Sequence, residues 1–149
     1  MLRRFGILGM FIAALMALSM ATALAAGGQA NGTGKTHNGA SLGFNAKADL
    51  TGNFEYQSAD GSLNIHCNDY DMFEIMTTTA GFPLAWFSST NCYDKGGVQY
   101  KLIADLIDRG EGHNALRDGG HIVFKRLSDG MKVIIDVGHI QKGNIQIHV

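Results

Sequence analysis

The sequence predicts an all-β fold, an antiparallel β-sandwich or barrel-like domain of about eight short strands. Several short runs alternate apolar and polar residues with a period of two, which places successive side chains on opposite faces of a strand. Asp-Gly pairs separate some of these runs, and this pair favours hairpin turns because both residues tolerate positive φ. The runs are short and closely spaced, with 20 Gly and 1 Pro in 149 residues, as is typical of sandwiches and barrels.

The first 25 residues have the pattern of a secretory signal peptide. Arg3 and Arg4 form a basic start, and residues 5–20 carry no charge. Residues 23–25 read Ala-Leu-Ala, the small-x-small pattern of a cleavage site, so we expect cleavage after Ala25 and export of the chain. The alternative is an uncleaved membrane anchor, because the apolar run approaches the roughly 20 residues that cross a bilayer. The alanine content and the polar, Gly-rich stretch that follows favour cleavage.

The rest of the chain divides into a tail and a domain. Residues 26–40 consist largely of Gly, Asn and Thr, with little to bury, so we expect a flexible Gly/Asn-rich tail. From Ser41 onward, short apolar runs alternate with Gly, Asn and Asp. Residues 41–149 are therefore expected to form a single β domain of ordinary size.

The expected strands share period-two alternation or a short apolar run between turn residues. They lie at residues 53–57, 62–67, 71–76, 84–89, 100–109, 121–126, 132–137 and 144–149. Asp60-Gly61 is expected to join the first two as a hairpin, and residues 128–130 (Ser-Asp-Gly) to join the sixth and seventh. Pro83 precedes the fourth strand, where its missing N–H does least harm.

One of these strands, residues 100–109, fits two kinds of structure. Leu102, Ile103, Leu106 and Ile107 match an amphipathic helix that ends at Gly110. The same four residues match a strand with two apolar faces. The short length and the β-rich neighbourhood favour the strand.

Cys67 and Cys92 are the only cysteines. In an oxidising compartment such a pair predicts a disulfide, which would close a loop of roughly 25 residues. A metal-thiolate pair and a redox pair are the alternatives, and the wide spacing without a Cys-x-x-Cys motif disfavours both. Near this disulfide, Trp86, Phe87 and Tyr93 are expected to be core residues rather than an exposed aromatic platform.

Four carboxylates gather around a Gly-rich turn: Asp105, Asp108, Glu111 and Asp118. Calcium prefers several oxygen ligands from such loops, so these residues form a candidate calcium site, although their spacing is not that of an EF-hand. The simpler interpretation is a solvated acidic turn. No other cofactor is indicated.

Five segments of the chain resemble a family of small secreted bacterial domains called post-COAP, which often follow a choice-of-anchor P domain. The similar segments are residues 43–47 (GFNAK), 52–56 (GNFEY), 63–67 (LNIHC), 105–112 (the acidic turn) and 143–148 (GNIQIH). The acidic turn departs from the family pattern because it lacks a proline. The resemblance implies a β-rich exported module and supplies no catalytic residues.

The sequence defines the function of the protein less well than it defines the fold. Without the signal the net charge is about −3 and no basic block occurs, so nucleic acid is not an expected partner. No complete catalytic motif is present, which favours an exported structural or interaction module that binds a protein, a glycan or a cell surface. The alternatives are a calcium-stabilised envelope module and a secreted hydrolase. The hydrolase would require Asp105, Asp108, Glu111, His113 and Asp118 to converge in one concave pocket.

Overall fold

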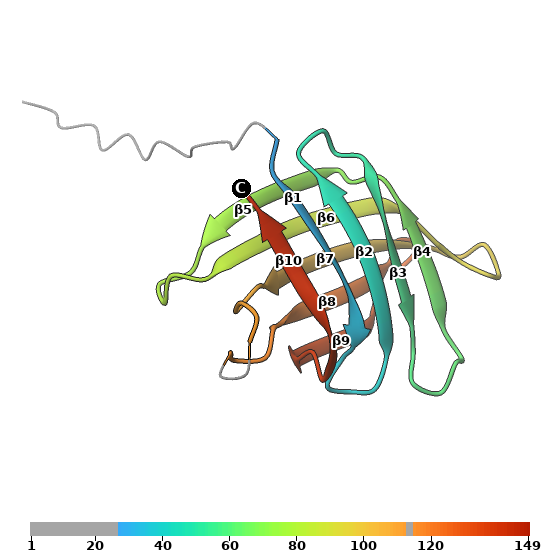
Figure 1. Ribbon diagram of the computed structural model, residues 1–149. Helices are drawn as coiled ribbons and strands as arrows, with labels where there is room; N and C mark the ends of the chain where they lie inside the picture. Colours follow the sequence, from blue (N-terminus) through green and yellow to red (C-terminus); the bar gives the residue numbers. More distant parts are fainter. Residues whose placement is uncertain (1–26, 113–114) are drawn as a thin grey trace, which may run out of the picture.

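The computed structural model describes residues 27–112 and 115–149, and they form one curled sheet of ten antiparallel strands (Figure 1). The strands are β1 (Gln29–Lys35), β2 (Ser41–Lys47), β3 (Gly52–Gln57), β4 (Asn64–Asn68), β5 (Met72–Thr77), β6 (Pro83–Asp94), β7 (Gln99–Ile107), β8 (Gly119–Arg126), β9 (Lys132–His139) and β10 (Lys142–His148). Within the described residues there is no helix, and hence none with the length and apolar character that crossing a membrane requires.

The order of strands in the sheet is β10-β1-β2-β3-β4-β6-β7-β8-β9. The remaining strand, β5, also pairs with β6, along a different stretch of this long strand from the one that pairs with β4. The sheet curls so that one half, β10 to β3, lies across from the other half, β6 to β9 (Figure 1). β9 and β10 follow each other in the chain but do not pair. The result is a half-barrel with a core between its two halves, which confirms the predicted fold class.

All eight predicted strands are present, and both predicted hairpins are antiparallel pairs, β3 with β4 and β8 with β9. The ambiguous segment is a strand, β7, that pairs with β6 and β8. Leu102, Ala104 and Leu106 are buried on its inner face, whereas Ile103 and Ile107 lie half-buried on the outer face. The apolar residues that match an amphipathic-helix pattern therefore lie on the two faces of one strand.

The prediction of a flexible tail is wrong for residues 29–35, which form β1 between β10 and β2. The inward positions of this strand are Ala30, Gly32 and Gly34, so no apolar alternation is visible in the sequence. They are small because neighbouring side chains fill the space: a Cβ on Gly32 would lie 2.8 Å from a ring atom of Phe44 and 2.7 Å from the Asn144 carbonyl oxygen. The β domain thus begins before residue 41, and the strands number ten.

Four phenylalanines join the two halves of the half-barrel. Phe44 stacks on Phe87 with ring centroids 5.6 Å apart, and Phe54 lies 6.1 Å from Phe124. All four rings are buried. Their centroid separations are those at which aromatic pairs add to the stability that burial provides. The prediction that the aromatic group of β6 is core holds for Phe87 alone. Trp86 is half-buried on the outer face and Tyr93 is 40% exposed, because both alternate with buried neighbours.

Asp136 connects β9 to the opposite half of the sheet. This buried carboxylate accepts hydrogen bonds from the Thr36 hydroxyl (2.5 Å), the Asn38 amide (3.0 Å) and the Tyr56 hydroxyl (3.0 Å). Burial and, next, the negative charge of Asp136 raise the pKa of Tyr56, so its hydroxyl remains a donor. A buried charge is tolerated when it is hydrogen-bonded in this way.

Cys67 and Cys92 form the predicted disulfide. They lie directly opposite each other on β4 and β6, and both are fully buried. The bond fixes the strand pair through which the sheet turns from one half to the other.

Reducing the disulfide is expected to lower the free energy of unfolding by about 3 kcal/mol, because a loop of roughly 25 residues regains its freedom in the unfolded chain. Urea denaturation with and without dithiothreitol measures this loss. The double variant Cys67→Ala/Cys92→Ala is the control, since reductant should leave its denaturation unchanged. Equal stability of the oxidised and reduced wild-type protein would contradict the prediction.

Candidate functional site

The acidic turn lies between β7 and β8, and two of its carboxylates bind the free edge of β10. Asp118 accepts hydrogen bonds from the backbone N–H groups of Ile145 (2.7 Å) and Arg109 (2.8 Å), and Asp108 accepts one from Ile147 (3.0 Å). Ile145 and Ile147 are alternate residues on β10, so the two carboxylates occupy positions that carbonyl groups of a further strand would take. The acidic turn therefore seals an open sheet edge.

Glu111 fastens the same turn from the solvent side. Its Oε1 accepts hydrogen bonds from the side-chain amides of Asn144 and Gln146, each at 2.7 Å. These two bonds hold the pKa of Glu111 below its ordinary value, and the bond from Gln146 has the larger effect. Asp108, Glu111 and Asp118 thus come together along β10, each holding N–H donors.

Asp105 lies apart from the other three carboxylates. It sits on the outer face of β7, where its Oδ2 is 3.0 Å from Nδ1 of His121 on β8. Within the part of the chain that the structure describes, no three His, Cys, Asp or Glu side chains are grouped so as to hold a metal ion. His113 lies outside the described residues. Of the four placed carboxylates, Asp108, Glu111 and Asp118 thus lie along β10, and Asp105 lies on the outer face of β7.

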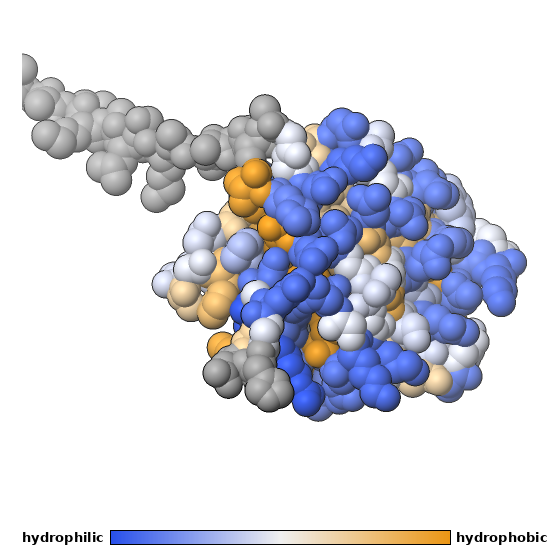
Figure 2. All heavy atoms as spheres, viewed as in Figure 1, coloured by the Kyte–Doolittle hydropathy of each residue, from blue (hydrophilic) through white to orange (hydrophobic). Residues whose placement is uncertain are grey.

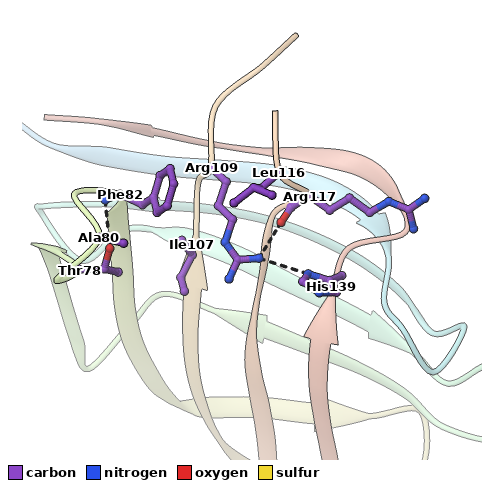
Figure 3. A pocket seen from close by; sticks show the side chains of 8 residues that line it. All are labelled: Thr78, Ala80, Phe82, Ile107, Arg109, Leu116, Arg117 and His139. Carbon is purple, nitrogen blue, oxygen red and sulfur yellow. Dashed lines mark hydrogen bonds between the residues drawn. The ribbon is translucent and has the colours of Figure 1, made fainter. Parts of the chain in front are cut away.

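The arginines of this turn have different surroundings from its carboxylates. Arg109 and Arg117 line a pocket of about 540 Å³ at the end of the half-barrel where the acidic turn lies (Figure 3). Its other lining residues come from the β5–β6 turn, the end of β7, the acidic turn and the end of β9; they are Thr78, Ala80, Phe82, Ile107, Leu116 and His139. Most of this lining is apolar, with Phe82 and Leu116 near the Arg109 side chain (Figure 3).

Arg109 is held in place and has donors without a partner among the described residues. Its Nη1 donates to the Arg117 carbonyl oxygen (2.8 Å) and lies 3.2 Å from Nδ1 of His139. A guanidinium has no acceptor, so Nδ1 of His139 accepts this bond and the ring proton resides on Nε2. Among the described residues no hydrogen bond leaves Nη2 or Nε, and no carboxylate forms an ion pair with Arg109.

A fixed guanidinium in an apolar pocket is suited to binding an anion. Nη2 and Nε form a planar fork that matches the two oxygens of a carboxylate. The sequence analysis missed this pocket because its residues come from four separate segments. The one signal in the sequence was that Arg109 directly follows Asp108 and Arg117 directly precedes Asp118. Sequence adjacency does not show, however, that the carboxylates face β10 and that the arginines face the pocket.

No family model, curated protein or solved structure matches this chain. The resemblance to post-COAP domains accordingly stays a prediction.

Replacing Asp118 by alanine is expected to cost about 2–3 kcal/mol of stability, because it leaves the N–H groups of Arg109 and Ile145 without their acceptor. Asp118→Asn keeps one acceptor oxygen and should cost less. Glu111→Ala is the matched control, since its exposed partners can bond to water, and its cost should stay below about 1 kcal/mol. Urea denaturation measures all three, and equal losses for Asp118→Ala and Glu111→Ala would contradict the edge-sealing role.

Calcium is expected to leave the melting temperature unchanged, because both carboxylate oxygens of Asp108 and of Asp118, and one of Glu111, already accept hydrogen bonds. A calcium site with the affinity typical of extracellular modules would instead raise the melting temperature by several degrees at about 10 mM Ca²⁺. Thermal melts with Ca²⁺ and with chelator decide between the two. A rise that disappears in Glu111→Gln would restore the calcium interpretation.

Proposed function

We propose that the protein is an exported interaction module whose ligand is a small organic anion with an apolar body, bound in the Arg109 pocket. The observation that carries the proposal is the Arg109 guanidinium, which lies among apolar side chains with Nη2 and Nε free of described partners. Export is supported by the N-terminal signal pattern and by the Cys67–Cys92 disulfide.

The size and lining of the pocket favour a small molecule over a polymer. A volume of about 540 Å³ lies within the roughly 300–1,000 Å³ range of small-molecule sites, which are mostly apolar with a few polar groups that fix orientation. In the proposed complex a carboxylate binds side-on to Arg109, while the apolar body contacts Phe82, Leu116 and Ile107. The Thr78 hydroxyl, which already accepts a hydrogen bond from the Phe82 N–H, lies on the wall of the same pocket.

Charge is the feature that selects the ligand. A neutral ligand of the same shape would gain the apolar contacts but not the charged hydrogen bonds, which are worth about 1.5–3 kcal/mol. An anion without an apolar body would gain only the charged hydrogen bonds. The pocket should therefore bind octanoate better than either octanol or acetate.

The test is a titration of the exported, ¹⁵N-labelled protein with octanoate, followed by NMR. Octanoate is expected to shift signals of Phe82, Ile107 and Arg109, and Arg109→Gln should weaken its binding about tenfold or more. The matched control is Arg126→Gln, which removes the same charge from an exposed ion pair with Asp129 and should leave binding unchanged.

Two results would overturn the proposal. One is an equal affinity for octanoate and 1-octanol, which would show that charge contributes nothing. The other is an unchanged octanoate affinity in Arg109→Gln, provided that this variant melts like the wild type.

A further inference from the structure

A row of side-chain amides crosses the outer face of five neighbouring strands, from β10 through β1, β2 and β3 to β4. Each residue of the row pairs directly with the one on the next strand, and in order they are Gln146, Asn31, Asn45, Asn53 and Asn68. All are exposed except Asn31, which is half-buried. The surface over β10 to β3 is mainly hydrophilic (Figure 2). The row is therefore a continuous strip of uncharged donors and acceptors that faces solvent.

Neither strand formation nor the hydrogen bonds within the fold account for this row. Asn is depleted in strands, whereas Thr suits solvent equally and favours strands. Among the described residues, the side-chain amides that donate hydrogen bonds are those of Asn38, Gln99, Gln141, Asn144 and Gln146. Gln146 is the only member of the row among them. The other four amides carry donors and acceptors that the described part of the fold does not use.

At the β10 end of the row the surface is hollowed. The hollow has a volume of about 280 Å³, and its lining residues are Asn31, Gly32, Thr33, Phe44, Asn144 and Gln146. Gly32 keeps it open, because a Cβ at this position would lie 2.8 Å from a ring atom of Phe44. Phe44 is the one apolar side chain of the lining, and the other side chains are polar and uncharged. The hollow thus combines a small apolar surface with several hydrogen-bonding groups.

Two of the amides in the hollow are held in fixed positions by Glu111. Nδ2 of Asn144 and Nε2 of Gln146 both donate to Oε1 of Glu111, each at 2.7 Å. Their own carbonyl oxygens are therefore presented to the hollow as positioned acceptors. Side chains that are fixed before binding lose less conformational entropy when a ligand binds.

We propose that this row and the hollow bind an extended, uncharged polysaccharide, with one sugar ring in the hollow and the following units along the row. The hydroxyl groups around a sugar ring are both donors and acceptors, as are side-chain amides. The C–H groups on the face of the ring give an apolar surface that Phe44 can contact. The row repeats once per strand, every ~4.8 Å, which is close to the length of one sugar unit in an extended chain.

The charges around the site favour an uncharged glycan over an acidic one. The row itself contains no ionisable group, and the carboxylate nearest to it is Glu111, which binds Gln146. An acidic sugar in the hollow would be repelled by this carboxylate. None of the residues that line the hollow lines the Arg109 pocket, so the glycan site and the proposed anion site are independent.

The test is an NMR titration of the exported, ¹⁵N-labelled protein with three uncharged hexasaccharides: cellohexaose, maltohexaose and chitohexaose. At least one is expected to shift the side-chain amide signals of Asn31, Asn45 and Asn53, with a dissociation constant on the order of 1 mM, as befits a shallow site. The corresponding monosaccharide should bind more weakly and should shift the signals of Asn31 but not those of Asn53.

Substitutions along one strand separate the row from the rest of the polar face. Asn53→Ala removes an amide of the row beyond the hollow and should weaken hexasaccharide binding about threefold, while monosaccharide binding stays unchanged. Gln57→Ala is the matched control, because it removes an exposed amide from the same strand and the same face but outside the row. It should leave hexasaccharide binding unchanged, as should Arg109→Gln.

Three results would overturn the proposal. The first is that none of the three hexasaccharides shifts these signals at about 10 mM, roughly ten times the expected dissociation constant. The second is an equal effect of Asn53→Ala and Gln57→Ala on hexasaccharide binding, with both variants melting like the wild type. The third is tighter binding of hexagalacturonate, an acidic hexasaccharide, than of any uncharged one.

Discussion

The fold depends on how a curled sheet satisfies two edges that do not meet. β9 and β10 follow each other in the chain but do not pair, and an unpaired N–H that is shielded from water costs stability. Carboxylates solve this problem at the β10 edge, and another carboxylate ties β9 to the opposite half of the sheet. Asp118 and Asp108 accept the N–H groups of Ile145 and Ile147 on β10, and Asp136 joins β9 to the β1–β2 turn and to β3. Asp108 and Asp118 thus act as acceptors at an edge where no further strand pairs.

This way of sealing the edge also shapes the surface of the molecule. Asp108 and Asp118 are directed toward β10, and their sequence neighbours Arg109 and Arg117 line the pocket. The loop therefore has two chemical sides, an acidic one within the fold and a basic one in the pocket. The outer faces of the sheet also differ. The outward residues of β10 to β3 are nearly all polar (Figure 2), whereas those of β5 to β9 include the exposed Met72, Met76, Ile135 and Val137. The proposed anionic ligand occupies a feature that the fold itself does not use.

Particular residues show how far the sequence predicts this arrangement. Leu63, Ile65 and Cys67 alternate with polar residues, and the hairpin that they predict is present. β1 was not predicted because its inward residues are Ala30, Gly32 and Gly34, which show no apolar alternation. The small size of Gly32 is explained only by the position of Phe44 on the next strand. Trp86 was placed in the core by its type, whereas alternation along β6 puts Phe87 inside and Trp86 outside. The carboxylates of the turn were recognised as a group, but their partners on β10 were not.

The sequence by itself determined the strand-rich fold, the hairpins and the pairing of the two cysteines, because each follows from local alternation, from turn residues or from the count of one residue type. Only the tertiary structure decided that β1 is a strand, that Asp118 seals the β10 edge while Asp136 joins β9 to the opposite half, and that Arg109 faces an apolar pocket. These features depend on contacts between segments 27 to 100 residues apart. Such contacts are set by the curl of the whole sheet, and no local pattern of residues encodes which strands that curl brings together.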